Sequence, residues 1–130
     1  MKRGMRMVVI VFISLVVLNA VLIICSSTVI YDAKRVFKGE IEPSEEIGAL
    51  IRYYPRNDSR YASELKTKIT IIPLFAIHNF RNGYVYVLYS EETRDKATGE
   101  IIHGSSGITS CWKIKKFMGK WRVVEITESP

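Results

Sequence analysis

The distribution of apolar and charged positions divides the chain into two parts. From residue 7 to residue 31 there are 25 positions without a charged side chain, rich in Val, Ile and Leu. At about 1.5 Å per residue, a helix of this length spans roughly 37 Å, more than the roughly 30 Å hydrocarbon core of a bilayer. The pattern predicts a tail and transmembrane anchor over residues 1–31, which meets the lipid bilayer through residues 7–31, and one domain over residues 32–130.

Two other interpretations of the apolar segment stay open. A cleaved signal peptide would use Lys2 to Arg6 as its basic region and residues 25–27 as its small-residue end, but its apolar region usually runs only about 7 to 15 residues. A lipoprotein would carry its lipid on Cys25, and the bulky Ile24 before it disfavours that interpretation.

Basic residues flank the segment in equal number on both sides, and they are Lys2, Arg3 and Arg6 before it and Lys34, Arg35 and Lys38 after it. A short basic tail that also carries the amino terminus resists translocation. We therefore expect a single-pass signal-anchor protein with its N-terminus in the cytoplasm and its C-terminal domain extracytoplasmic.

The first third of the domain has helical periodicity. The helix is expected to leave the membrane through residues 32–37 and to end at Gly39. A second helix is expected from Ser44, because Ser can cap it and the apolar residues Ile47, Leu50, Ile51 and Tyr54 recur at helical spacing until Pro55. Residues 56–59 predict a turn, and residues 61–66 one more short helical piece.

From Thr67 onward the pattern is that of strands. Residues 69–80 predict a strand that is broken or bulged at Pro73, and Asn82-Gly83 predicts a hairpin turn. The return strand, residues 84–89, is apolar on both faces and is therefore expected to be central in the sheet. A polar loop is expected over residues 91–107, with turn residues at 97–99.

Residues 108–117 and 120–127 predict two more strands, joined by a turn at Met118-Gly119. That turn would pair Lys116 with Trp121, Lys115 with Arg122, Ile114 with Val123, Trp112 with Glu125 and Cys111 with Ile126. The face with the two tryptophans is expected to be core. The predicted fold class is α+β, with the N-terminal transmembrane helix followed by one or two short helices packed on a curved antiparallel sheet of about four strands.

The last two strands carry a family resemblance. Residues 112–116 (WKIKK) and 119–124 (GKWRVV) resemble the closing hairpin of small nuclear-transport-factor-2-like (cystatin-like) domains, including membrane-anchored bacterial ones. The resemblance covers residues 44–128 loosely and this hairpin specifically. It implies a cone-shaped fold with an internal pocket, and it implies no reaction, because the acidic or histidine pocket residues of the enzymes in that superfamily have no counterpart motif here.

Composition and charge restrict the functional classes. The chain has 130 residues and a net charge of +6, but three of the basic residues precede the domain, which has 16 basic and 13 acidic residues. A balance of +3 is too small to predict nucleic-acid binding. Cys25 and Cys111 lie in different parts of the chain, so the sequence predicts no disulfide framework.

Candidate catalytic and binding residues are few. His78 lies among apolar strand residues, as a half-buried sheet histidine does, and His103 lies in a Gly-Ser-rich stretch that falls one residue short of a nucleophile elbow. Residues 57–59 match the glycosylation pattern but are interpreted as a turn. We expect no catalytic, cofactor-binding or metal-binding residues, no cofactor and no enzymatic activity.

The basic cluster near the C-terminus has two interpretations. Its members, Lys113, Lys115, Lys116, Lys120 and Arg122, suit phosphate groups, an acidic partner or anionic lipid headgroups. They also suit a terminal hairpin whose lysines keep an edge strand from pairing with other molecules, which is the interpretation that we favour.

The leading functional hypothesis is a membrane-tethered, non-enzymatic interaction module that docks on a membrane or envelope complex. Strand alternation places Tyr84, Tyr86 and Leu88 on one face and Val85, Val87 and Tyr89 on the other. We expect the valine set to pack on the helices and Tyr84, Tyr86 and Leu88 to bind a protein partner or a second copy of the chain. The alternative is a small-ligand-binding or sensor domain that uses an internal pocket.

Overall fold

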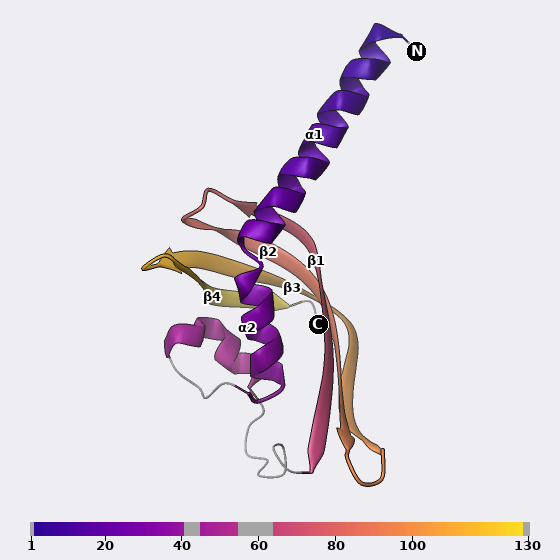
Figure 1. Cartoon of the computed structure of the whole chain (residues 1–130), viewed down its shortest axis with the longest axis vertical. Coiled ribbons are helices and arrows are strands. Elements are labelled where there is room, and N and C mark those ends of the chain that lie inside the picture. Colours follow the sequence, from indigo (N-terminus) through magenta and orange to yellow (C-terminus); the bar gives the residue numbers. More distant parts are fainter. Residues whose placement is uncertain (1, 41–44, 55–63, 129–130) are drawn as a thin grey trace.

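The computed structural model describes residues 2–40, 45–54 and 64–128, and only the backbone of residues 45 and 46. Two α-helices, α1 (Arg3–Cys25) and α2 (Thr28–Phe37), and a 3-10 helix, η1 (Glu45–Tyr53), precede four strands, which are β1 (Leu65–His78), β2 (Asn82–Asp95), β3 (Ile101–Phe117) and β4 (Lys120–Glu128). The strands form one open antiparallel sheet in the order β1-β2-β3-β4 (Figure 1). The predicted α+β class is confirmed.

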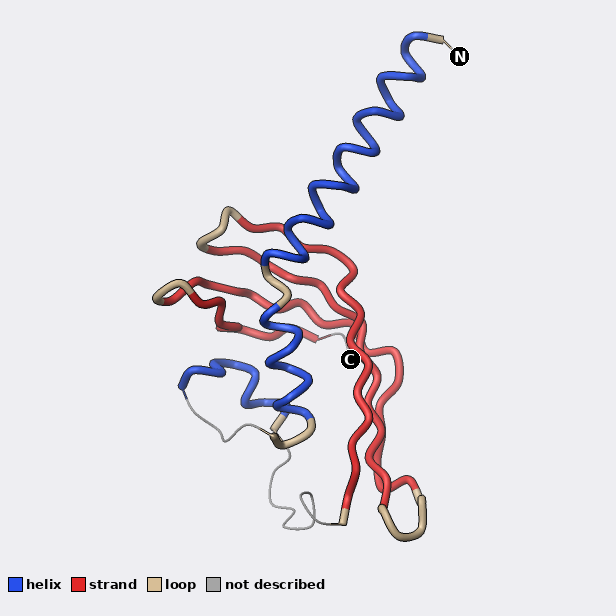
Figure 2. The backbone as a smooth tube through the Cα atoms, viewed as in Figure 1, coloured by secondary structure: helices blue, strands red, loops and turns tan. Residues whose placement is uncertain are grey.

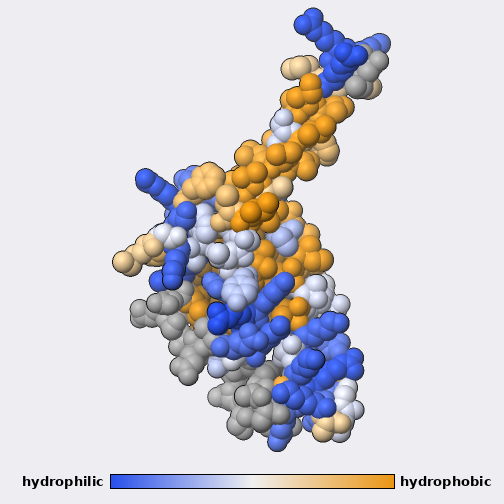
Figure 3. All heavy atoms as spheres, in the orientation of Figure 1, coloured by the Kyte–Doolittle hydropathy of each residue, from blue (hydrophilic) through white to orange (hydrophobic). Residues whose placement is uncertain are grey.

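The helices lie on one face of the sheet. We call the face that meets α2 and η1 the inner face and the opposite one the outer face (Figures 1 and 2). Most of α1 projects beyond the sheet, and its side chains form an apolar column in Figure 3. The most apolar 18-residue window of α1 has a mean hydropathy of 3.2, and none of that window is buried. The helix is therefore long and apolar enough to cross a membrane.

The apolar segment of the sequence contains a helix break. α1 ends at Cys25, and α2 begins at Thr28, so the last residues of the predicted anchor start a second helix. At the break the Ser26 and Ser27 hydroxyls donate to carbonyls one turn back in α1. Val29 is only 1% exposed and belongs to the domain core. The hydropathy of the sequence does not distinguish the end of α1 from the start of α2, because valine is favourable both in lipid and in a protein core.

The second predicted helix is a kinked 3-10 helix. Gly48 has φ 58°, and a Cβ there would lie 2.2 Å from the Val123 carbonyl oxygen, so this approach to β4 requires glycine. Ile47 and Leu50 are buried, but Ile51 is 40% exposed, so the expectation that the apolar residues of this helix all pack on the sheet is wrong for Ile51. Three residues per turn bring Tyr53 onto the face of Ile47 and Leu50 instead. The predictions for residues 55–63 lie outside the described residues.

The first hairpin turns earlier than predicted. The turn comprises residues 79–81, and Asn79 closes it by accepting the Arg81 and Asn82 amides on its side-chain oxygen. Asn82 and Gly83 are already in β2, so the predicted turn there is wrong. Gly83 is needed for close approach, since a Cβ at this position would lie 2.2 Å from the Ile77 carbonyl oxygen. The predicted irregularity at Pro73 is confirmed by a register shift between residues 73 and 75.

The predicted loop over residues 91–107 is mostly sheet. β2 continues to Asp95 and β3 begins at Ile101, leaving a turn that includes the expected residues 97–99. Gly104 approaches β2 closely, because a Cβ there would lie 3.0 Å from the Glu91 carbonyl oxygen. The helical prediction fails at residues 65 and 66, which open β1. The polar and glycine-rich residues of this segment therefore form the ends of two long paired strands and not a loop.

The last hairpin has the predicted turn at Met118-Gly119, and three of the predicted pairs are confirmed: Lys116 with Trp121, Lys115 with Arg122 and Ile114 with Val123. A bulge at Val124 then shifts the register by one residue, so Trp112 pairs with Ile126 and Cys111 with Thr127. The predicted pairs of Trp112 with Glu125 and of Cys111 with Ile126 are therefore wrong. The shift keeps Trp112 opposite an apolar residue.

The core lies between the inner face and the helices. Trp112 is fully buried and Trp121 is 7% exposed, which confirms the tryptophan face as core. Apolar residues of α2 at helical spacing complete it, namely Val29, Ala33, Val36 and Phe37.

Candidate interaction surfaces

The outer face of the sheet carries an exposed apolar patch on β1 and β2. Tyr84 and Tyr86 are 42% and 44% exposed, and Leu88 is half-buried on the same face. Val85, Val87 and Tyr89 are buried on the inner face against the helices, as the alternation predicts. The structure therefore brings the three predicted partner-binding residues onto one accessible surface.

Sequence reasoning missed half of this patch. In the sheet, β1 places Ile72 opposite Leu88, Phe75 opposite Tyr86 and Ile77 opposite Tyr84. The Phe75 and Tyr86 rings lie 6.0 Å apart, and the three β1 residues are 45–54% exposed. Side chains alternate between the two faces of a strand, but the bulge between residues 73 and 75 interrupts this alternation. Counting through the bulge from Ile72 would place Phe75 and Ile77 on the wrong face, so the sequence pattern did not reveal the β1 half of the patch. We define the outer apolar patch by six residues: Ile72, Phe75, Ile77, Tyr84, Tyr86 and Leu88.

The C-terminal turns of α1 are fixed to the domain. The Asn19 side-chain amide donates to the Ala76 carbonyl oxygen at 2.9 Å, and the Trp121 indole donates to the Cys25 carbonyl oxygen at 3.0 Å. His78 Nε2 lies 2.9 Å from the Leu22 carbonyl oxygen, and His78 Nδ1 accepts the Phe80 amide. Nε2 therefore carries the proton and donates to α1. His78 connects the helix to β1, and this is a structural role.

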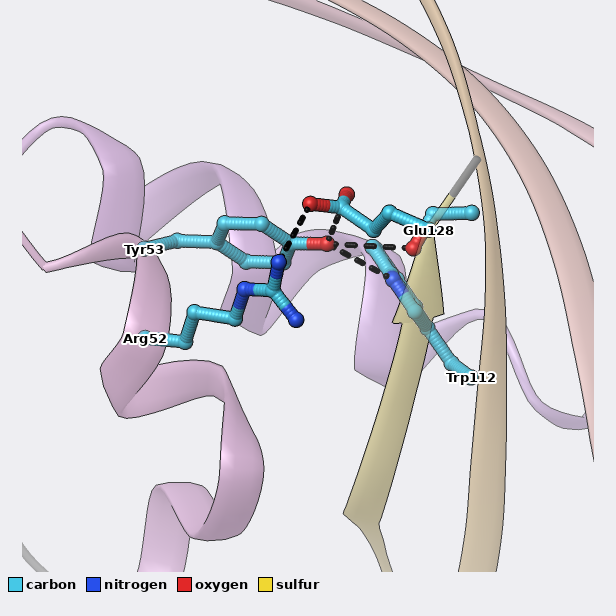
Figure 4. A network of polar contacts seen from close by, with 5 residues as sticks. Arg52, Tyr53, Trp112 and Glu128 are labelled. Carbon is cyan, nitrogen blue, oxygen red and sulfur yellow. Dashed lines mark hydrogen bonds and ion pairs between the residues drawn. The ribbon is translucent and has the colours of Figure 1, made fainter. Parts of the chain in front are cut away.

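A polar network holds η1 to the end of β4 (Figure 4). The Tyr53 hydroxyl donates to Glu128 at 2.7 Å, accepts the Trp112 indole at 3.2 Å and lies 3.1 Å from the Ser110 hydroxyl. Arg52 pairs with the other oxygen of Glu128 at 3.1 Å. Burial, aided by Glu128, raises the pKa of Tyr53 to about 12, and burial also raises the pKa of Tyr89. Both phenols stay protonated at neutral pH, and the Tyr53 hydroxyl donates to Glu128, so the network has a structural role.

A groove of about 720 Å³ opens between α2 and the β3–β4 hairpin. Its lining includes one acidic residue and four basic ones, which are Asp32, Arg35, Lys116, Lys120 and Arg122. Partial burial raises the pKa of Asp32, although Arg35 and Lys120 oppose that effect. This groove lies beside the end of α1, because Cys25 and Thr28 also line it. The sequence singled out three of the basic residues, but not their position next to the helix.

The described part of the chain offers little for catalysis or metal binding. His103 Nδ1 lies 4.0 Å from Glu91, in a strand and not in the predicted loop. Burial raises the pKa of Glu91, and His103 partly offsets that shift. Within residues 2–40, 45–54 and 64–128, no group of three or more His, Cys, Asp or Glu side chains could hold a metal ion.

Comparisons with protein-family models, with characterised proteins and with solved structures give no match to this chain. The resemblance to nuclear-transport-factor-2-like domains therefore stays a prediction.

Proposed function

We propose that the chain is a membrane-tethered, non-enzymatic interaction module, which docks on a protein of the same membrane through the outer apolar patch. The observation that carries the proposal is the difference between the two faces of the sheet. The inner face is packed by helices, whereas six apolar residues of the outer face, from two adjacent strands, remain in contact with solvent. Contiguous apolar patches of this kind mark interaction sites in soluble domains.

The position of the patch supports a partner within the membrane. Phe75 and Ile77 flank Ala76, whose carbonyl oxygen accepts the Asn19 amide of α1. The patch thus lies on the opposite face of the part of β1 that contacts α1. A partner with a helix beside α1 in the bilayer and a domain on the same side as the sheet would reach both surfaces. The aromatic rings of Phe75, Tyr84 and Tyr86 provide large contact area at low entropic cost, as binding hot spots do.

The orientation follows from the basic tail. With Lys2, Arg3 and Arg6 at the cytoplasmic end of α1, the domain and its patch face the extracytoplasmic side. A second copy of the chain is the competing partner, because it presents the same patch. The two differ in the mass of the complex that they form.

Site-specific photo-crosslinking tests the proposal. A photoreactive phenylalanine analogue replaces Phe75 in the full chain, and the control carries it at Thr70, which is exposed on the same strand. Membranes from the native host are irradiated and then washed with alkaline carbonate, which leaves a membrane-spanning chain in the pellet. We expect a defined adduct with another integral membrane protein from position 75 and none from position 70. Tyr84→Ser with Tyr86→Ser should abolish the adduct and leave the melting temperature nearly unchanged.

Three outcomes contradict parts of the proposal. An adduct with twice the mass of the chain would mean that the partner is a second copy of the chain. Release of the chain by carbonate with its N-terminal segment removed would mean that α1 is a signal peptide. Equal adducts from positions 70 and 75 would mean that the patch has no specific partner.

A further inference from the structure

Two large apolar side chains occupy strained backbone positions at the tips of the hairpins. Phe80, in the β1–β2 turn, has φ 67°, and Met118, in the β3–β4 turn, has φ 51°. Residues other than glycine and asparagine adopt this left-handed region only at an energetic cost. Both are also exposed, Phe80 by 50% and Met118 completely. Neither folding nor solubility favours these residues at these positions, so their apolar side chains point to a ligand outside the chain.

The two tips lie together beside the end of α1. The Lys116 amide donates to the Arg81 carbonyl oxygen at 2.8 Å, which joins the turns of the two hairpins. His78 and Trp121 then bind the Leu22 and Cys25 carbonyls of α1, as described above. Figure 1 shows both turns projecting to the same side of the lower end of α1. If α1 crosses a bilayer, the tips lie at the depth where that helix leaves it.

Basic side chains lie next to the Met118 tip. Lys116, Lys120 and Arg122 line the groove next to Met118, and Arg35 reaches it from α2. Its volume of about 720 Å³ falls within the roughly 300–1,000 Å³ of typical small-molecule sites. Phosphate suits such a groove, because four cations face it and Asp32 is the one acidic residue in its lining. Apolar tips flanked by cations are the pattern of a surface that lies on anionic lipid.

We propose that the two hairpin tips and the groove behind Met118 bind anionic phospholipids of the bilayer that α1 crosses. Phe80 and Met118 enter the boundary between headgroups and acyl chains. Lys116, Lys120 and Arg122 contact the headgroup phosphates. This site shares the membrane tether with the proposed function but does not depend on the outer apolar patch, since no residue is common to both.

A fluorescent probe on the full chain tests this inference. Cys25 and Cys111 are replaced by serine, Met118→Cys is labelled with an environment-sensitive dye, and Phe80→Cys serves as a second, independent probe position. The chain is reconstituted in phosphatidylcholine bilayers with and without phosphatidylglycerol. Nitroxide-labelled analogues of each lipid are then compared as quenchers. A third arm adds inorganic phosphate to phosphatidylcholine bilayers, which separates a lipid headgroup from a free anion.

We expect the phosphatidylglycerol analogue to quench both probes more strongly than the phosphatidylcholine analogue. Lys116→Gln with Lys120→Gln should reduce this preference by about fivefold for each charge removed, the usual contribution of a basic residue near an anionic surface. The matched control, Lys66→Gln with Lys68→Gln at the opposite end of β1, should leave it unchanged. Probes that remain in a water-like environment in every bilayer, equal quenching by both lipids, or a response to phosphate alone would each overturn the proposal.

Discussion

The two faces of strand β2 share one backbone, and both carry aliphatic or aromatic side chains, yet they have opposite environments. Val85 and Val87 are 1% and 0% exposed, whereas Tyr84 and Tyr86 are each more than 40% exposed. The inner set is covered by α2 and η1, and the outer set is flanked by apolar residues of β1 without cover. A strand that is apolar on both faces normally lies in a layer covered on both sides. Among the residues that the structure describes, no element covers the outer set, and the proposed function assigns that cover to a partner.

The largest expected effect on stability comes from comparing two isoleucines, one on each face of the sheet. Ile114 is fully buried on the inner face, and Ile77 is 54% exposed in the outer apolar patch. Ile114→Ala should lower the free energy of unfolding by about 2–5 kcal/mol, because it removes methyl groups from a packed core. Ile77→Ala should change it by less than about 0.5 kcal/mol. Urea denaturation of the full chain in detergent measures both. A loss of several kcal/mol for Ile77→Ala would mean that the patch is core.

A smaller effect is expected from the phenols. Tyr53→Phe removes the acceptor of the buried Trp112 indole and the donor to Glu128, and it should cost about 1–3 kcal/mol. Tyr84→Phe, on the outer face, should have little effect. Comparable losses of stability for both variants would contradict the division between the faces.

The pH dependence of the same network has a definite sign. The pKa of Tyr53 rises to about 12 in the folded chain from an ordinary value of 10.0, because burial disfavours the phenolate. Its contribution to stability is therefore complete below pH 10 and is lost as the pH rises through 12. Phenolate absorbance and unfolding measured together across this range should show that Tyr53→Phe removes part of the alkaline loss. An identical alkaline profile for the variant would contradict this assignment.

The sequence predicted the features that depend on periodicity and on residue type. Strand alternation assigned the faces of β2 correctly, and the core position of Trp112 and Trp121 followed from the two apolar strands around them. The predictions were wrong where a close approach between two backbone segments, and not local propensity, determines the conformation. Gly83 and Gly104 read as turn and loop residues, although each one instead allows another backbone to approach, and the bulge at Val124 depends on pairing across the sheet. The β1 half of the outer patch was missed because a bulge interrupts the alternation.

If a partner covers the outer apolar patch in native membranes, Ile77 must be less accessible there than in the purified chain. In a chain with Cys25 and Cys111 replaced by serine, Ile77→Cys is treated with a membrane-impermeant maleimide, once in intact native cells and once after purification in detergent. Thr70→Cys, on the same strand and outside the patch, is the control. We expect Thr70→Cys to react equally fast in both preparations and Ile77→Cys to react much more slowly in cells. Equal rates for Ile77→Cys in cells and in detergent would contradict it.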